Sequence, residues 1–432
     1  MHDFHYKNGE LFCEQVPLSR IAAKHGTPCY VYSHGTIKDH FLKLDAALSP
    51  LDHTICYAVK ANSNIAVLKT IARLGGGFDV VSKGEIERVV AAGGDHKKCI
   101  FAGVGKTARE IEFALRLGIY AFNTESEAEL ERINQIAKRL KKKAPISIRV
   151  NPNVDAKTHA KITTGTYENK FGIAFERIKK IYAKASKLSH LQLKGVQMHI
   201  GSQLTTTDPF EGAVKKLVPL VKELKERFGI EFFSIGGGLG IVYEPALESG
   251  AASWWKRKEA ATILTPQSYA DRLVPLLEPL GIKILVEPGR FISGNAGALI
   301  TQVEYIKKTG QKNFVIVDAA MNDLIRPAFY EAHHDIVPLA RKGGARVSTD
   351  VVGPICESGD TFCKNRPLPR VKEGDYLAML SAGAYAFVMA SNYNTRPKPA
   401  EVMVKGKQFG VVRERETPAS LWAHEKIPNW IK

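Results

Sequence analysis

The polar residues that follow several apolar runs of this sequence could together carry out chemistry. Lys60 follows the run at 54–59, Asp79 lies in the next run, and His199 and Ser202 follow a later one. A lysine amine can form a Schiff base with an aldehyde, although most lysines are only solvated. Lys60 is therefore a candidate catalytic residue only if the other runs supply the remaining parts of a site.

Two glycine-rich segments follow later apolar runs and could bind a phosphate. Gly238 and Gly240 lie in a Gly-Gly-Gly-Leu-Gly segment, and Gly289 and Arg290 lie in a Glu-Pro-Gly-Arg segment. Glycine lets backbone amides approach an anion closely, and an arginine adds a fork of donors. The first segment is not a dinucleotide fingerprint, because Ile241 stands at the third glycine position. A flexible turn is the alternative for a glycine cluster.

Glu287 and His199 supply the parts that an aromatic cofactor needs. A protonated ring nitrogen needs an acid beside it, which Glu287 could be, and the ring needs a flat partner such as His199. Taken singly, His199 could be a satisfied strand-end histidine and Glu287 part of a surface ion pair. Combined with Lys60 and the two glycine segments, they make up the four parts of a pyridoxal phosphate site. We therefore predict pyridoxal 5'-phosphate as the cofactor.

Short apolar runs alternate with helical periods through the first two thirds of the chain. This order is typical of a parallel α/β fold, and eight strands with helical crossovers favour a closed (β/α)8 barrel of the TIM type. In such a barrel the active site lies at the carboxyl ends of the strands. The predicted strands cover residues 54–59, 78–81, 99–102, 120–123, 146–150, 195–200, 232–235 and 284–287, and the predicted helices 65–74, 85–92, 108–117, 125–140, 209–228 and 268–280.

The sequence changes character beyond about residue 290, where extended runs alternate with turn residues. We predict a barrel domain at 29–289 and a β-rich domain formed by 1–28 and 290–432. The segment at 29–32 also has an extended pattern. The strands predicted in the β-rich domain cover residues 299–306, 313–318, 350–353, 375–380 and 402–404.

Composition excludes several classes of protein. The 432 residues carry a formal net charge of +17, but the basic residues are spread along the chain and do not indicate nucleic-acid binding. The six cysteines contain no Cys-x-x-Cys pair, which argues against a disulfide framework and a metal site. The polar start and the lack of a long apolar run predict a cytoplasmic protein with no membrane span.

The β-rich domain carries its own candidate residues, although their pattern alone does not decide their roles. Cys356 and Glu357 place a thiol beside a carboxylate, and Arg326 and Tyr330 place a cation near a phenol. Tyr385 follows two small residues. A structural cysteine, a surface turn and a core tyrosine are the respective alternatives.

These residues stand in motifs that resemble the fold-type III pyridoxal phosphate-dependent decarboxylases, and the resemblance runs nearly end to end. The motifs are YAVKAN at 57–62, FDVVS at 78–82, NKFGI at 169–173, HIGSQ at 199–203, GGG at 236–238, EPGR at 287–290, DLIRP at 323–327, CESGD at 356–360 and GAY at 383–385.

The resemblance implies a role for each candidate residue. Lys60 would form the Schiff base with the cofactor, His199 would stack on its ring, and Glu287 would pair with the ring nitrogen. Cys356 would return a proton to the substrate carbon in the neighbouring subunit, which implies a homodimer. The remaining cofactor-binding residues would be Asp79, Ser202, Gly238, Gly240, Gly289, Arg290 and Tyr385.

The substrate expected from the resemblance is meso-diaminopimelate, converted to L-lysine and CO2 in the last step of lysine biosynthesis. The pocket must then bind a distal carboxylate, for which Arg290, Arg326 and Tyr330 are suited, and a distal ammonium, for which Glu357 is suited. Tyr385 would also contact the substrate. The alternatives are a decarboxylase of ornithine, arginine or carboxynorspermidine, a catalytically silent pyridoxal phosphate-binding protein, and a phosphate-binding barrel without this cofactor.

Some residues receive no role from the sequence. The stretch at 248–261 belongs to no motif of the family. We expect it to form a loop over the barrel mouth or a subunit contact, and its adjacent Trp254 and Trp255 suggest partial burial. Arg149 lies near the end of the predicted strand at 146–150 and Asn151 directly follows it, so both are expected near the site.

Overall fold

The computed structural model describes residues 1–154, 170–341 and 343–431, which divide into two compact units. The barrel unit comprises Ile37–Ile241 and Lys256–Ile292. The sheet unit comprises Met1–Thr36, Val242–Trp255 and Ser293–Lys432. Each unit is therefore assembled from segments that are distant in the sequence.

Parallel strands form a closed ring in the barrel unit. From β9 the order runs through β11, β12, β13, β5, β6 and β7 to β8, and β8 pairs with β9 again, so the predicted eight-stranded barrel is confirmed. The short β10 (Ile173–Ala174) adds to β9. The ring strands are β5 (His53–Ala58), β6 (Gly77–Val80), β7 (Cys99–Phe101), β8 (Ala121–Thr124), β9 (Ala144–Asn151), β11 (Leu191–Met198), β12 (Phe232–Ser234) and β13 (Lys283–Val286).

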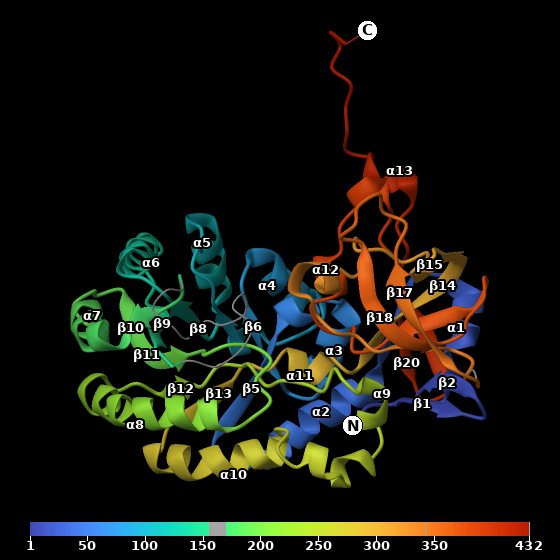
Figure 1. Ribbon diagram of the computed structural model, residues 1–432. Coiled ribbons are helices and arrows are strands. Elements are labelled where there is room, and N and C mark those ends of the chain that lie inside the picture. The colour runs from blue at the N-terminus through green and yellow to red at the C-terminus, as the bar shows by residue number, and fades with distance from the viewer. Residues whose placement is uncertain (155–169, 342, 432) are drawn as a thin grey trace. The chain divides into compact units, whose positions relative to one another are not determined.

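Helices cover the outside of this ring, and Figure 1 shows α5, α6, α7 and α8 around strands β8, β9 and β11. The six predicted helices correspond to α3, α4, α5, α6, α8 and α10, whereas α2 and α7 were not predicted. The eight residues of α7 are too few for a long apolar period. In α2 the buried Ile37, Phe41 and Leu44 do follow a helical period, so this helix was missed although its pattern was present. The helices are α2 (His34–Ala47), α3 (Ile65–Arg73), α4 (Lys83–Ala91), α5 (Ala108–Leu117), α6 (Glu127–Arg139), α7 (Ile178–Ala185), α8 (Asp208–Phe228) and α10 (Pro266–Leu277).

Three of the helices that follow barrel strands begin with a capping residue. The hydroxyl groups of Ser82, Thr107 and Ser126 each accept a hydrogen bond from the backbone amide three residues later. Such caps satisfy amides that would otherwise lack a partner in the first turn of the helix. The strand-to-helix connections are consequently short and well defined, and they hold the residues at the carboxyl ends of the strands in place.

A nine-stranded sheet organises the sheet unit. Its main path is β18-β17-β15-β14-β4-β20-β21, with β19 pairing to both β14 and β16. A separate three-stranded sheet is formed by β1 (Phe4–Lys7), β2 (Glu10–Cys13) and β3 (Val16–Pro17). The strands of the large sheet are β4 (Cys29–Ser33), β14 (Gly297–Lys308), β15 (Asn313–Val317), β16 (Ile336–Pro338), β17 (Arg346–Val352), β18 (Thr361–Pro369), β19 (Tyr376–Met379), β20 (Ala400–Lys405) and β21 (Gln408–Arg413).

Strand β4 is central to this sheet, and its residues alternate between two apolar cores. Cys29 and Val31 belong to one core, and Tyr30 and Tyr32 belong to the other. Because successive side chains of a strand point to opposite faces, both faces of the sheet are covered and all five residues of β4 are buried. The predicted domain boundary at residue 29 differs from the observed units for this reason.

The segment Val242–Trp255 also belongs to the sheet unit, although the barrel domain was predicted to run from 29 to 289. It contains α9 (Ala246–Ser249), and Ala246 packs in a core of the sheet unit. Trp254 is buried and meets the ring of Trp255 edge to face, while the Trp255 indole donates to the Ser249 carbonyl oxygen. The expected burial of this tryptophan pair is therefore observed for Trp254.

Candidate active site

The amine of Lys60 lies at the carboxyl end of β5, paired with a buried carboxylate. Lys60 is the middle residue of a single 3-10 turn, η1 (Val59–Ala61), that follows the strand. Its Nζ lies 2.6 Å from Oδ2 of Asp79, which β6 carries beside the end of β5. The Lys60 side chain is 41% exposed, whereas that of Asp79 is 1% exposed. The amine can thus be reached by a ligand while its counter-ion is held inside the barrel.

The second oxygen of Asp79 has unmet hydrogen-bonding capacity. Oδ1 is buried and has no hydrogen-bond partner among the described residues. An unsatisfied buried polar atom costs about 1 to 3 kcal/mol, so such atoms are uncommon without a functional reason. This oxygen lies beside the predicted cofactor lysine.

Glu287 follows β13 and receives hydrogen bonds from three other strands. Ser234 Oγ donates to Oε1 at 2.6 Å, Gln197 Nε2 donates to Oε2 at 3.1 Å, and Asn123 Nδ2 donates to Oε1 at 3.4 Å. Burial and the nearby charge of Asp79 raise the pKa of Glu287 to about 7, although the hydrogen bonds from Ser234 and Gln197 act in the opposite direction. The carboxyl group can therefore carry or release a proton near neutral pH.

His199 directly follows β11, and its imidazole is neutral. The backbone amide of Gly237 donates to its Nδ1 at 3.2 Å, which leaves Nε2 as the protonated nitrogen of a neutral imidazole. Burial, with the charges of Arg149 and Lys60, lowers the pKa of His199 well below its ordinary value. A neutral flat ring at a strand end suits stacking on an aromatic ligand.

The glycines after β12 are required by close backbone contacts. A Cβ on Gly238, whose φ is +107°, would lie 2.5 Å from the carbonyl oxygen of Gly201. A Cβ on Gly240 would lie 2.7 Å from the carbonyl oxygen of Leu204. Leu204 and Gly240 are joined by a backbone hydrogen bond of 2.8 Å. The segment is therefore a tightly packed cradle of backbone.

Arg290, Ser202 and Gly289 complete this corner of the barrel unit. Arg290 Nη2 donates to Ser202 Oγ at 3.0 Å, which brings together two residues predicted to bind the phosphate. A Cβ on Gly289 would lie 2.8 Å from Cβ of Ala61, beside the Lys60 turn. Arg290 begins α11 (Arg290–Ser293), and its side chain is buried.

Several polar residues of the barrel interior were missed by sequence reasoning. Asn123, Gln197 and Ser234 hold Glu287, and each is a buried polar residue that directly follows an apolar residue in its strand. That polarity was the available signal, because a buried polar group requires a partner. Glu85 on α4 was also missed. Burial raises its pKa to about 7, against the opposing effects of the Val81 amide and the charge of Lys60.

Arg149 takes part in a buried charge cluster at the end of β9. Its Nη1 lies 3.3 Å from Oε2 of Glu125, and its guanidinium stands 4.8 Å from the centroid of the Phe171 ring. Its Nη2 is buried without a hydrogen-bond partner among the described residues. Asn151 donates to the Phe171 carbonyl oxygen at 3.4 Å. Asn169, the first residue of the predicted NKFGI motif, lies outside the described residues.

The sheet unit brings Arg326 and Tyr330 together on the short helix α12 (Arg326–Tyr330). Arg326 is buried, and its guanidinium lies 5.7 Å from the Tyr330 ring centroid and 5.4 Å from that of Tyr243. Cation-to-ring contacts of this kind stabilise a buried guanidinium. A buried arginine with restrained orientation is suited to bind a carboxylate.

Cys356 and Glu357 lie on an exposed loop that is stabilised by hydrogen bonds to the Asp360 side chain. The Asp360 carboxylate accepts hydrogen bonds from the backbone amides of Ile355, at 2.8 Å, and Met321, at 2.7 Å. The exposed Cys356 thiol is free. Two neighbours contact the loop: Asn394 Nδ2 lies 3.5 Å from Cys356 Sγ, and the Tyr393 hydroxyl donates to Glu357 Oε2 at 3.1 Å.

Tyr385 adopts a backbone conformation that non-glycine residues rarely use. Its φ is +56°. Gly383, two residues earlier, could not carry a side chain, because a Cβ there would lie 1.9 Å from the Ser293 carbonyl oxygen. Strained positions of this kind persist where the surrounding structure holds them, and they cluster at functional sites.

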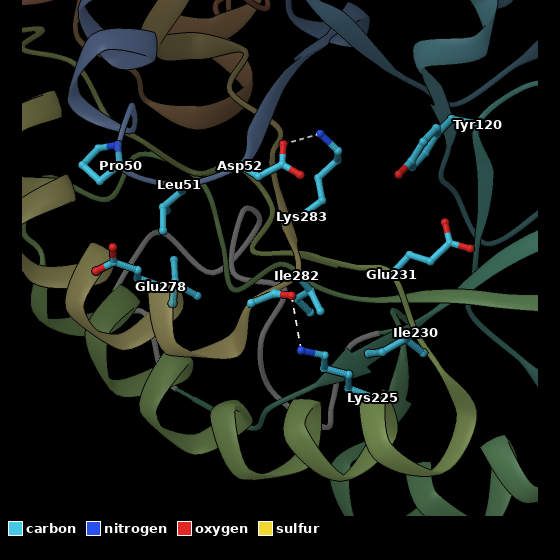
Figure 2. A pocket seen from close by; sticks show the side chains of 12 residues that line it. Pro50, Leu51, Asp52, Tyr120, Lys225, Ile230, Glu231, Glu278, Ile282 and Lys283 are labelled. Atoms are coloured by element: carbon cyan, nitrogen blue, oxygen red, sulfur yellow. Dashed lines mark hydrogen bonds and ion pairs between the residues drawn. The ribbon is translucent and has the colours of Figure 1, made fainter.

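A hollow of about 490 Å³ lies at the opposite, amino ends of β5, β8, β12 and β13. Figure 2 shows Lys283 paired with Asp52 near the top of the view. Lys225 lies lower, and its amine is directed up at the backbone carbonyl oxygen of Gly281. None of the predicted site residues lines it. Its lining mixes lysines with the carboxylates Asp52, Glu231 and Glu278.

Residues 1–154, 170–341 and 343–431 contain no group of three or more side chains arranged to hold a metal ion. Across the same ranges, every helix is too short or too polar to cross a membrane.

Comparison with known proteins identifies the family. Residues 34–294 match the family model described as pyridoxal-dependent decarboxylase, pyridoxal binding domain. The chain belongs to the pyridoxal-dependent decarboxylases. This decarboxylase is 50% identical over 430 residues to the diaminopimelate decarboxylase of Vibrio cholerae, and the match covers 99% of each chain. The resemblance drawn from the motifs is confirmed.

Solved structures agree with this assignment. A crystal structure of diaminopimelate decarboxylase from Helicobacter pylori, complexed with L-lysine, matches with a TM-score of 0.87 and 42% identity, covering 94% of this chain and 98% of that one. The corresponding enzyme from M. jannaschii, also in complex with L-lysine, matches with a TM-score of 0.90 and 37% identity over 99% of both chains.

Proposed function

We propose that this decarboxylase removes CO2 from meso-diaminopimelate to give L-lysine, using pyridoxal 5'-phosphate. The observation that carries the proposal is the strand-end cluster, in which an accessible lysine amine, a buried acid and a neutral histidine ring converge on one end of the barrel unit. The full-length relatives named diaminopimelate decarboxylase support the choice of substrate.

The residues of the barrel unit fit a phosphorylated pyridine aldehyde. The glycine cradle at Gly238 and Gly240 would let a phosphate approach the backbone closely, and Ser202 and Arg290 beside it offer a hydroxyl and a cation. Lys60 would hold the cofactor covalently, and the unsatisfied oxygen of Asp79 would face it. When bound, the cofactor withdraws electrons from the substrate α-carbon so that the carboxylate can leave as CO2.

The protonation of Glu287 is the main contribution of the barrel unit to this electron withdrawal. A carboxyl group with a pKa of about 7 can keep a proton shared with a ring nitrogen at neutral pH. The donors Ser234 and Gln197 fix the position of its oxygens. His199 contributes a flat neutral surface and does not place a second positive charge beside the ring.

Residues of the sheet unit would bind the distal end of the substrate and supply its proton. Arg326 and Tyr330, with Arg290, are proposed to bind the distal carboxylate, and Glu357 the distal ammonium. The exposed Cys356 would deliver a proton from Sγ to the substrate carbon after CO2 leaves. By the family resemblance this thiol acts in the neighbouring subunit, with Tyr385 closing over the phosphate, so we also propose a homodimer.

The proposed compartment is the cytoplasm. All six cysteines are free thiols, and five of them are buried in the two units. Free thiols are typical of reducing compartments. This point is independent of the substrate assignment.

A spectrum and a substrate panel test the proposed function. The purified protein should show a visible absorbance band from its bound cofactor, and Lys60→Ala should lose that band, because Lys60 is the proposed covalent attachment. Lys69→Ala, which changes a lysine on α3, is the matched control and should keep the band. A band that persists in Lys60→Ala would contradict the role of this lysine.

The substrate panel separates the alternatives. CO2 release should be fastest from meso-diaminopimelate and at least about 100-fold slower from ornithine, arginine, lysine and carboxynorspermidine, because these would leave a buried arginine without its carboxylate. Faster release from one of the other amino acids would identify a different decarboxylase. A visible band without CO2 release from any substrate would indicate a catalytically silent binding protein.

A further inference from the structure

We propose that His334 is a positioning residue that orients Arg326 for the distal carboxylate of the substrate, an inference that rests on the proposed function. His334 lies in the sheet unit, four residues after helix α12, and is only 1% exposed. It was not among the residues that the sequence singled out. Its two ring nitrogens have different partners, and this asymmetry is the basis of the proposal.

The first nitrogen anchors the imidazole to the backbone. His334 Nδ1 lies 2.8 Å from the carbonyl oxygen of Leu380, the residue that follows β19. A carbonyl oxygen can only accept, so Nδ1 must carry a proton. The ring is thereby fixed to the end of a strand in the large sheet.

The second nitrogen contacts Arg326. Nε of Arg326 donates to Nε2 of His334 at 3.4 Å. Because a guanidinium has donors and no acceptor, Nε2 must be unprotonated at this contact. His334 is therefore a neutral imidazole whose tautomer is set by Leu380 on one side and Arg326 on the other. The ring therefore holds the guanidinium at a fixed position relative to the end of β19.

Aromatic rings restrain the same guanidinium from other directions. Tyr243 and Tyr330 lie at 5.4 Å and 5.7 Å from it, and the Tyr243 ring also meets His334 edge to face at 5.5 Å. An arginine binds a carboxylate with two nitrogens in one plane, so the direction of binding depends on how that plane is held. A hydrogen bond at Nε determines the rotation of the plane, which a ring contact alone does not.

The neighbouring His333 provides a natural comparison. Its Nε2 lies 2.9 Å from Oδ1 of Asp335, and its Nδ1 lies 3.3 Å from Oε2 of Glu244. The side chain is 25% exposed. His333 thus belongs to a partly exposed cluster of charges, and the same substitution there changes a histidine without removing the acceptor that faces Arg326.

The test compares two substitutions that each keep half of the His334 contacts. Asn in His334→Asn can still donate to Leu380 but is too short to reach Arg326. Gln in His334→Gln can place an acceptor near the position of Nε2. His333→Asn is the matched control, and Arg326→Met measures the effect of removing the guanidinium itself.

Two inhibitors report on the distal carboxylate separately from the rest of the pocket. Decarboxylation at one end of diaminopimelate leaves L-lysine, whose carboxylate is the distal one, and 1,5-diaminopentane is the same chain without it. The measurements are KM and kcat for diaminopimelate, inhibition constants for both amines, the visible spectrum and the melting temperature of the holoenzyme.

We expect His334→Asn to raise KM for diaminopimelate and the inhibition constant of L-lysine by about tenfold, as for a weakened charged hydrogen bond. Inhibition by 1,5-diaminopentane, the spectrum and the melting temperature should change little. His334→Gln should recover most of the affinity for L-lysine, and His333→Asn should resemble the wild type.

Two results would overturn the inference: equal weakening of both inhibitors by His334→Asn, which indicates general damage, or unchanged affinity for L-lysine in that variant. The Arg326→Met variant distinguishes this failure from a failure of the proposed substrate site. If Arg326→Met leaves L-lysine affinity unchanged, Arg326 does not bind the distal carboxylate. If it weakens L-lysine and His334→Asn does not, only the role of His334 is wrong.

Discussion

Glu287 illustrates how neighbours that are distant in the sequence determine the properties of one side chain. Its carboxyl group lies at the end of β13 and is held by donors from β8, β11 and β12. Burial, followed by the charge of Asp79, raises its pKa from 4.5 to about 7. The folded protein consequently holds this proton more tightly than the unfolded chain does.

This shift predicts a pH dependence of stability in the cofactor-free protein. Between about pH 4.5 and 7 the folded state binds more protons at Glu287 than the unfolded state, so its contribution is complete at low pH and is lost as the pH rises through 7. Glu287→Gln, which stays neutral, should remove that loss, on the order of 2 kcal/mol. Denaturant unfolding at about pH 5 and pH 7.5 measures the difference, and parallel curves for the two proteins would contradict it.

At the scale of an element, the segment after β12 also depends on neighbours that are distant in the sequence. The amide and carbonyl groups of Gly238 and Gly240 face the backbone of Gly201 and Leu204, which follow β11. Two neighbouring strands thus present two backbone segments that pack together without side chains. The missing side chains let a ligand approach this backbone closely, and the proposed phosphate binds there.

Gly238→Ala should disrupt this element. The substitution combines a positive φ with a Cβ 2.5 Å from a carbonyl oxygen, and the strain should cost about 1 to 3 kcal/mol. We expect the Kd for pyridoxal phosphate to rise at least about tenfold. Gly212→Ala, in helix α8 with open space at its Cβ, should leave the Kd unchanged. A Kd for Gly238→Ala within about twofold of the wild type would exclude the cradle as the phosphate site.

At the scale of the whole molecule, the proposed dimer makes a prediction about mixed subunits. Lys60 lies in the barrel unit and Cys356 in the sheet unit. If one site takes Lys60 from one chain and Cys356 from the other, Lys60→Ala and Cys356→Ala are each inactive alone. A mixture of both in equal amounts should recover about one quarter of wild-type activity, since half the dimers are mixed and each has one intact site.

The control for this experiment mixes Lys60→Ala with the Lys60→Ala, Cys356→Ala double variant. No arrangement of those subunits combines both native residues, so this mixture should stay inactive. Activity in the first mixture no greater than the sum of its parts would show that each chain completes its own site.

The strand-end residues could be identified from the sequence because local periodicity predicts where each strand ends. Lys60, His199, Glu287 and Arg290 all stand at such positions, and the eight barrel strands were predicted from the same pattern. A parallel barrel brings its carboxyl strand ends to one face, so order along the chain was enough to expect a single site. The short α7 was missed because eight residues hold only two turns of apolar period.

The sequence by itself determined the fold class and the family, and it placed the candidate site residues at the ends of the barrel strands. Only the tertiary structure decided which partners surround them: the three donors on Glu287, the membership of β4 in the large sheet and the contact of His334 with Arg326. These are pairings between residues on different elements, and many are far apart in the sequence. Local periodicity encodes which face of an element is buried, but it does not encode which other element covers that face.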